Sequence, residues 1–220
     1  MERGLFDKVE CVRFDNCFME SSSHWLLGQP VNTITNVGFI VVGLIILFST
    51  HSSLPKLQRY LLSATGIVIG LSSAYYHMTM TFLGQILDLT GMYMLAAFVL
   101  FYAVMRLRHW DNKRFLLAYF ALLAPLLTVL VFLPEIRNFV FAAVLLAGLV
   151  FEFIAGNKDK LDWHLLLASL LVLLVAFAVW LCDINRIIDF NGHAIWHIFN
   201  AVALYLLFRY YSTKRKLKNA

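Results

Sequence analysis

Polar residues at helical spacing stand out in this otherwise apolar chain. His193 and His197 are four residues apart in "NGHAIWHIFN", as are Ser73 and His77 in "GLSSAYYHMTM", and Asp88 follows in "GQILDLTGMY". Residues four apart share a helix face, so His193 and His197 can bind one ion with both rings. A catalytic zinc usually takes three protein ligands and leaves a fourth position to water, and His77 is the obvious third ligand. The spacing therefore predicts a zinc site at His77, His193 and His197.

Asp88 and Ser73 are the groups that hydrolysis would use beside such a metal. Asp88 could accept a proton from the metal-bound water, whose pKa zinc lowers to about 7. Ser73 lies one helical turn before His77 and could donate a hydrogen bond to a substrate carbonyl or oxyanion.

Each of these signals has a plainer interpretation when taken alone. The histidine pair could be interfacial and pack with Trp196, Ser73 could bond back to its own helix, and Asp88 could simply favour a helix N-terminus. The combination favours a metal site, because three histidines and an aspartate all fall at the ends of expected helices on the same side of the membrane. The remaining histidines form no pair at helical spacing, and we expect them to be solvated or interfacial: His24, His51, His109 and His164.

The composition indicates a membrane protein. Of the 220 residues, 61% are hydrophobic and only 14% are charged, the mean hydropathy is +0.76, and soluble domains carry about 25% charged residues. The net charge of +5 does not indicate a nucleic-acid partner, because the basic residues lie in short loops and in the tail. No loop is long enough to form a second core, so residues 1–220 are expected to form one domain.

Seven stretches are long and apolar enough to cross a bilayer, which takes about 20 residues each. They are 31–50, 60–78, 85–105, 115–133, 137–155, 163–182 and 193–212. Because the connections are short, consecutive helices must be antiparallel neighbours, and we predict an all-α seven-transmembrane helix bundle. Residues 1–30 would precede the first span without a signal peptide, and 213–220 would form a basic tail. Glu152 is expected near the inner end of its helix, where it can reach water.

The distribution of basic residues orients this bundle. The connections after the first, third and fifth helices, together with the chain's C-terminal end, hold 13 of the 18 Lys and Arg, and the other side holds 5. The positive-inside rule then places the N-terminus outside and the tail in the cytoplasm. Helix direction puts Ser73, His77, Asp88, His193 and His197 near the outer, exoplasmic face.

The joint motif resembles the CREST superfamily of membrane hydrolases, and within it the alkaline ceramidase family most closely. The likeness rests on "SSAYYHMT", on Asp88 eleven residues after His77, on "HAIWH", and on "QPVNTITN" at 29–36. The resemblance implies zinc held by His77, His193 and His197, with Asp88 positioning the water and Ser73 assisting at the carbonyl. The adiponectin-receptor-like branch shares these residue types but usually has its N-terminus inside, and the charge distribution argues against that branch.

Alkaline ceramidases of animals also have an outer calcium site near helix 1. This chain keeps Asp15 and Glu20 of that pattern, whereas Phe18 and Gln29 stand where the family has acidic ligands. Two carboxylates are few for a cation that takes about 6–8 oxygen ligands. The sequence therefore weighs against calcium at Asp15 and Glu20.

The first hypothesis is a zinc-dependent amidohydrolase of the bilayer that cleaves ceramide-like N-acyl sphingoid lipids to a fatty acid and a sphingoid base. The alternatives are hydrolysis of another lipid amide or ester, and a seven-helix receptor in which a structural zinc staples the helices. A transporter fits less well, because the polar groups gather at one face. The sequence leaves open the acyl-chain length, the membrane, the oligomeric state, and any pairing of Cys11, Cys17 and Cys182.

Overall fold

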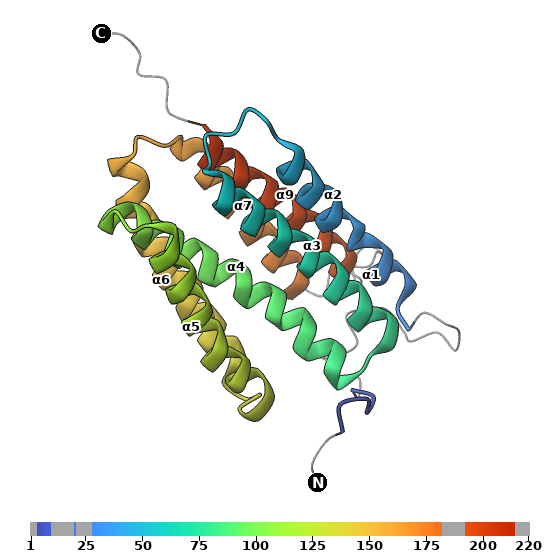
Figure 1. Ribbon diagram of the computed structural model, residues 1–220. Helices are drawn as coiled ribbons and strands as arrows, with labels where there is room; N and C mark the ends of the chain where they lie inside the picture. The colour runs from blue at the N-terminus through green and yellow to red at the C-terminus, as the bar shows by residue number, and fades with distance from the viewer. Residues whose placement is uncertain (1–3, 10–19, 21–27, 182–191, 214–220) are drawn as a thin grey trace.

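Helices make up most of this computed structural model, which describes residues 4–9, 20, 28–181 and 192–213 (Figure 1). The helices are α1 (Pro30–Thr35), α2 (Val37–Phe48), α3 (Lys56–Thr79), α4 (Phe82–Arg108), α5 (Asn112–Phe132), α6 (Arg137–Lys158), α7 (Trp163–Leu181) and α9 (Gly192–Ser212). The one strand-like pairing in the described part is a single bridge between Lys8 and Thr81. The expected all-α fold is confirmed, with the first expected helix divided into α1 and α2.

Five helical stretches are long and apolar enough to cross a membrane. They are Pro30–Phe48, Phe82–Arg108, Asn112–Phe132, Arg137–Lys158 and Trp163–Trp180. The helices α3 and α9 are outside this group because they carry more polar residues, among them the three histidines of the expected metal site. Seven spans and their orientation therefore remain predictions.

Small residues let α2 and α3 approach each other closely. A Cβ on Gly70 would lie 2.7 Å from the Ile40 side chain and 3.0 Å from the Asn36 carbonyl oxygen. Further along, the Ser63 hydroxyl donates to the carbonyl of Gly43 at 2.7 Å. These close contacts, typical of membrane helices, hold α2 against the part of α3 between Ser63 and Gly70.

The remaining packing divides the bundle into two sides (Figure 1). Helix α4 packs against α3, α5 and α6, whereas α7 packs against α9, and α9 packs against α2. Although α6 and α7 follow each other in the chain, they have no extended contact: the rings of Phe153 and Trp163 meet near the connection, with centroids 4.9 Å apart. The two sides are thus joined mainly through α3 and through one polar network at the end of the bundle where α9 ends.

That network surrounds Glu152 of α6 and corrects the expectation that this residue reaches water. The Glu152 side chain is fully buried. It forms an ion pair with Arg106 of α4 and accepts hydrogen bonds from Tyr210 at 2.7 Å and Tyr211 at 3.0 Å on α9. Arg106 also pairs with Asp159 at 3.0 Å. Two tyrosines of a distant helix cover the carboxylate, which local sequence could not reveal.

Candidate metal centre

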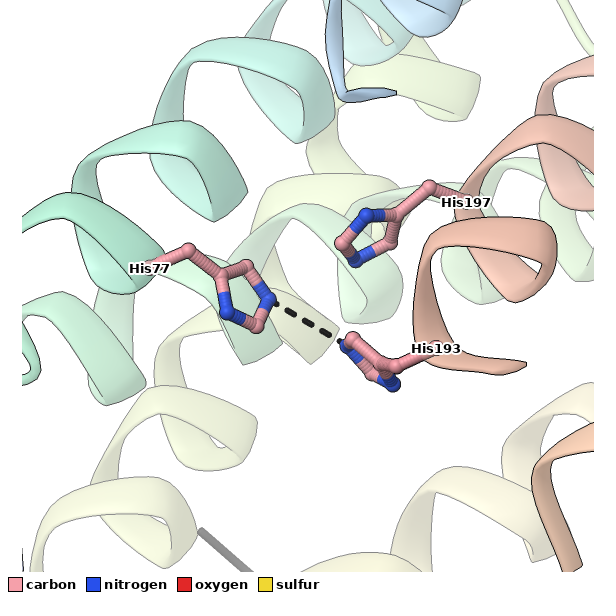
Figure 2. Close-up of side chains that lie close together, drawn as sticks. All are labelled: His77, His193 and His197. Carbon is pink, nitrogen blue, oxygen red and sulfur yellow. Dashed lines mark hydrogen bonds between the residues drawn. The ribbon is translucent and has the colours of Figure 1, made fainter. Parts of the chain in front are cut away.

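Three buried histidines meet between the end of α3 and the start of α9 (Figure 2). His77 lies in the last turn of α3, and His193 and His197 lie in the first two turns of α9. Their exposed fractions are 0%, 5% and 3%, and one ring nitrogen from each lies within 4.8 Å of the others. Among the described His, Cys, Asp and Glu residues, these three form the group that could hold a metal ion.

The distance between His77 and His193 suits a tetrahedral ion. The Nε2 atoms of His77 and His193 are 3.2 Å apart, and two ligands about 2.0–2.1 Å from a tetrahedral zinc are themselves separated by about 3.3 Å. The rings are tilted toward one another at 57–76° and are not stacked. Nitrogen donors of this kind favour zinc over calcium or magnesium, which prefer oxygen. The residues present therefore fit a zinc ion.

The chain just before α1 is docked onto the end of α3. The backbone N–H groups of Gly28 and Gln29 donate to the carbonyl oxygens of Met78 and His77, both at 2.9 Å. A Cβ on Gly28 would lie 3.0–3.1 Å from the same two oxygens, so glycine suits this close approach. The docking satisfies carbonyls that a helix C-terminus leaves without intrahelical partners, and it places Gln29 beside the histidine ring.

Gln29 fixes the orientation and the tautomer of His77. Its buried Oε1 lies 2.7 Å from Nδ1 of His77, and its Nε2 donates to the carbonyl of Glu20 at 2.8 Å. Because the amide nitrogen is used on Glu20, the amide oxygen faces the ring and must accept the Nδ1 proton. Nε2 of His77 then carries the lone pair that faces the other histidines. A histidine that binds zinc commonly has its other ring nitrogen fixed by a hydrogen bond in this way.

Thr35 does the same for His197. Its Oγ1 lies 2.9 Å from Nδ1 of His197, and its single proton is shared with the carbonyl oxygens of Val31 at 3.0 Å and Asn32 at 3.1 Å. The hydroxyl is therefore the acceptor for the Nδ1 proton of the ring. This assignment leaves Nε2 of His197 as the metal-facing nitrogen.

Glu20 serves α1. Its two carboxylate oxygens accept the backbone N–H groups of Val31 at 3.0 Å and Asn32 at 2.9 Å, in the first turn of the helix. An acidic group at a helix N-terminus is stabilised by the free N–H groups and the helix dipole. The other carboxylate of the expected calcium pattern, Asp15, lies outside the described residues, as do Cys11, Cys17 and Cys182.

A tight turn between α3 and α4 sets the two helices side by side. Met80 ends α3 with a left-handed backbone (φ 51°), and the Thr81 hydroxyl caps α4 by accepting the Gly84 N–H at 3.2 Å. A Cβ on Gly84 would lie 2.9 Å from the Cα of Tyr76, so α4 starts in direct contact with α3. The second turn of α4 consequently comes to lie beside the preceding turns of α3.

Ser73 and Asp88 meet across this contact. The buried Ser73 side chain lies near the half-buried carboxylate of Asp88, close enough for the two groups to interact. Ser73 is one turn, about 5.4 Å along the helix, from His77. Asp88 supplies no atom to the three-histidine group. The Ser73 hydroxyl has one proton, so it cannot donate to Asp88 and to a substrate oxygen at the same moment.

Sequence reasoning did not assign Gln29 and Thr35 to the metal centre. Both residues belong to the segment "QPVNTITN" that resembles the family, and Gln29 also stands where the family has an acidic calcium ligand. Residues 29, 32 and 35 are all polar in "QPVNTIT" and recur every three positions at the start of a spanning segment. That spacing puts polar groups on one helix face, which is costly in a membrane and could have indicated contact with the histidines.

The comparisons with known proteins agree on one family. A family model described as Ceramidase matches residues 23–220, which include the three histidines, Gln29, Thr35, Ser73 and Asp88. Alkaline ceramidase 1 of Mus musculus is 30% identical over 195 residues, covering 79% of this chain and 69% of that protein. Alkaline ceramidase 1 of Homo sapiens is 27% identical over 190 residues (79% and 71%). Alkaline ceramidase of Drosophila melanogaster is 29% identical over 212 residues (87% and 74%).

Proposed function

This chain belongs to the ceramidase family, and on that premise we propose that it hydrolyses the amide bond of ceramide-like N-acyl sphingoid lipids with a zinc ion held by His77, His193 and His197. The products are a fatty acid and a sphingoid base. The observation that carries the proposal is the buried three-histidine group, in which the Nε2 atoms of His77 and His193 are as far apart as two zinc ligands would be.

Two of the three imidazoles are held by hydrogen bonds as neutral ligands. Hydrogen bonds to Gln29 and Thr35 hold the Nδ1 protons of His77 and His197 away from the centre. A zinc ion bound there would polarise the substrate carbonyl and lower the pKa of a water molecule to about 7. Three protein ligands leave the fourth position for that water and the substrate.

Asp88 is the proposed general base and acid. Hydrolysis adds the hydroxyl of water to the carbonyl carbon and breaks the carbon–nitrogen bond, so one proton must travel from water to the leaving amine. The Asp88 carboxylate takes that proton and returns it to the amine nitrogen. The Ser73 hydroxyl holds the carboxylate in place and, once Asp88 is protonated, is free to donate to the developing oxyanion.

The proposed membrane topology delivers the lipid to this centre. With seven spans and the N-terminus outside, the histidines lie near the exoplasmic face, where the polar part of a lipid resides. Helices α6 and α7 have no extended contact beyond the one near their connection, where the Phe153 and Trp163 rings meet, and this supports a lateral route for acyl chains between the two sides of the bundle.

The test is hydrolysis by purified protein. The protein in lipid nanodiscs receives an N-acyl sphingosine, the matching O-acyl ester, or a phospholipid, and released fatty acid is measured by mass spectrometry. We expect turnover of the amide by wild type and loss of turnover in Asp88→Asn with the metal retained. His164→Ala, an exposed histidine at the start of α7, is the control and should keep full activity. Zinc-loaded wild type that turns over none of these lipids would favour a structural zinc in a receptor.

A further inference from the structure

A polar cavity lies at the opposite end of the bundle from the histidines, where α2 and α9 both end. Its volume is about 300 Å³, and its lining includes Ser49, His51, Ser52, Arg209 and Ser212. Ile45 and Phe208 form apolar walls. The lining therefore changes from apolar to polar along the axis of the helices, as the surroundings of a lipid change at the membrane surface.

The hydroxyl groups in this cavity offer a proton that the described chain does not use. The Oγ atoms of Ser52 and Ser212 are 2.7 Å apart, and Ser52 also accepts the N–H of Leu54 at 3.1 Å. The two hydroxyls have two protons, and one lies between the oxygens. In either direction of that bond, the other proton remains to donate to a ligand.

Two guanidinium groups add positive charge and have no acidic partner among the residues that the structure describes. Arg209 donates to the Tyr205 hydroxyl at 3.2 Å, and Arg59 donates to the carbonyl of Ser49 at the cavity wall. The ion pairs found among the described residues both use Arg106. Nε of Arg59 is buried and has no hydrogen-bond partner in the described part of the chain. The cavity lining contains no Asp or Glu.

The helix dipole accounts for only part of this arrangement. A cation in the last turn of α9 is favoured by the free carbonyl groups there, and this explains Arg209. It does not require a cavity, a hydroxyl pair with a spare proton, or a second arginine beside the end of α2. Together these groups present several donors and no carboxylate acceptor, which is the pattern that a phosphate group satisfies.

We propose that this cavity binds a phosphate group, carried by an anionic membrane lipid or free in solution. Arg209 and the Ser52–Ser212 pair donate to phosphate oxygens, and Arg59 adds positive charge. Ile45 and Phe208 face the apolar part of a lipid. The sequence places the basic-rich end of the bundle at the cytoplasmic surface, where anionic lipids attract basic residues between helices. This binding is separate from hydrolysis at the histidines.

The experiment compares thermal stability and native mass spectra of the full protein with three additions: phosphatidylglycerol, phosphatidylcholine and inorganic phosphate. We expect phosphatidylglycerol to raise the melting temperature and to remain bound. Phosphatidylcholine should do neither, because the cationic choline on its phosphate would lie beside the positive charges of Arg209 and Arg59. Arg209→Gln combined with Ser212→Ala should weaken retention by about fivefold or more, the effect of one basic residue at a membrane surface. If inorganic phosphate raises the melting temperature equally, the cavity binds phosphate from solution and does not require a lipid.

The matched control is Lys113→Gln, an exposed basic residue at the start of α5 and outside the cavity lining. It should keep the lipid preference, and His193→Ala should keep it too, because the cavity is remote from the histidines. The proposal would be overturned if both lipids were retained equally, or if the Arg209→Gln and Ser212→Ala double variant bound phosphatidylglycerol as wild type does. It would also be overturned if Lys113→Gln lost as much phosphatidylglycerol as the double variant.

Discussion

The amide oxygen of Gln29 lies 2.7 Å from Nδ1 of His77, and both residues are fully buried. This bond joins the chain before α1 to the last turn of α3. It determines which nitrogen of His77 is available to a metal, so a residue outside the ligand set controls the basicity and direction of a ligand.

Replacing Gln29 by Ala is expected to weaken zinc binding by about 10- to 100-fold, the usual cost of removing an outer-shell partner. The affinity is measured by competition with a chromogenic chelator. Gln58→Ala is the matched control, because Gln58 is also fully buried but bonds to Asn112 at the other end of α3. Equal loss of zinc affinity in both variants would show that Gln29 acts only through general stability.

Thr35→Val should lower zinc affinity by about tenfold, because valine has a similar shape and cannot accept the Nδ1 proton of His197. Thr35→Ser keeps the hydroxyl and should restore the affinity. The same chelator competition gives the values. If valine and serine bind zinc equally well, the hydrogen bond at 2.9 Å does not set the tautomer.

Glu152→Ala should destabilise the protein by about 3–5 kcal/mol, because it leaves the Arg106 guanidinium partly buried without its main partner. Unfolding by sodium dodecyl sulfate in mixed micelles measures the change. The side chain of Asp159, the other partner of Arg106, is 33% exposed. Asp159→Ala should therefore lower the free energy of unfolding by less than about 1 kcal/mol. The reverse order of the two effects would contradict the assigned network. Zinc content should be unchanged in both variants.

Gly70→Ala is expected to cost about 1–3 kcal/mol by overpacking the contact of α2 and α3. The added methyl group would lie 2.7 Å from the Ile40 side chain. Gly38→Ala is the control, since its nearest neighbour, the Cβ of Ala201, would be 3.3 Å away. Thermal denaturation in detergent should show a clearly larger loss for Gly70→Ala, and equal melting temperatures would argue against a tight contact there.

The helices and the grouping of histidines were accessible from the sequence, because both follow from local regularities. Apolar runs of about 20 residues predict helices without knowledge of the partners. Histidines four apart must share a face, and short loops return consecutive helices to the same end of the bundle. For these reasons His77 of α3 and the pair on α9 could be placed together before their distances were known.

The surroundings of these residues were not accessible in the same way. Gln29 reaches His77 only because the backbone of residues 28 and 29 docks on the carbonyl groups of α3. Glu152 is buried by tyrosines from a helix 58 and 59 residues further along the chain. Such contacts depend on how the helices pack against one another, and the periodicity of a single sequence does not reveal that packing.

The proposed hydrolysis depends most directly on zinc at the three histidines. The measurement is the metal content of wild type and His193→Ala by inductively coupled plasma mass spectrometry, after purification without added metal. We expect about one zinc per wild-type chain, since three histidines form one site, and a nearly complete loss in the variant while its helical circular dichroism spectrum is unchanged. A folded wild type without zinc, or a variant that keeps all of it, would contradict the assignment.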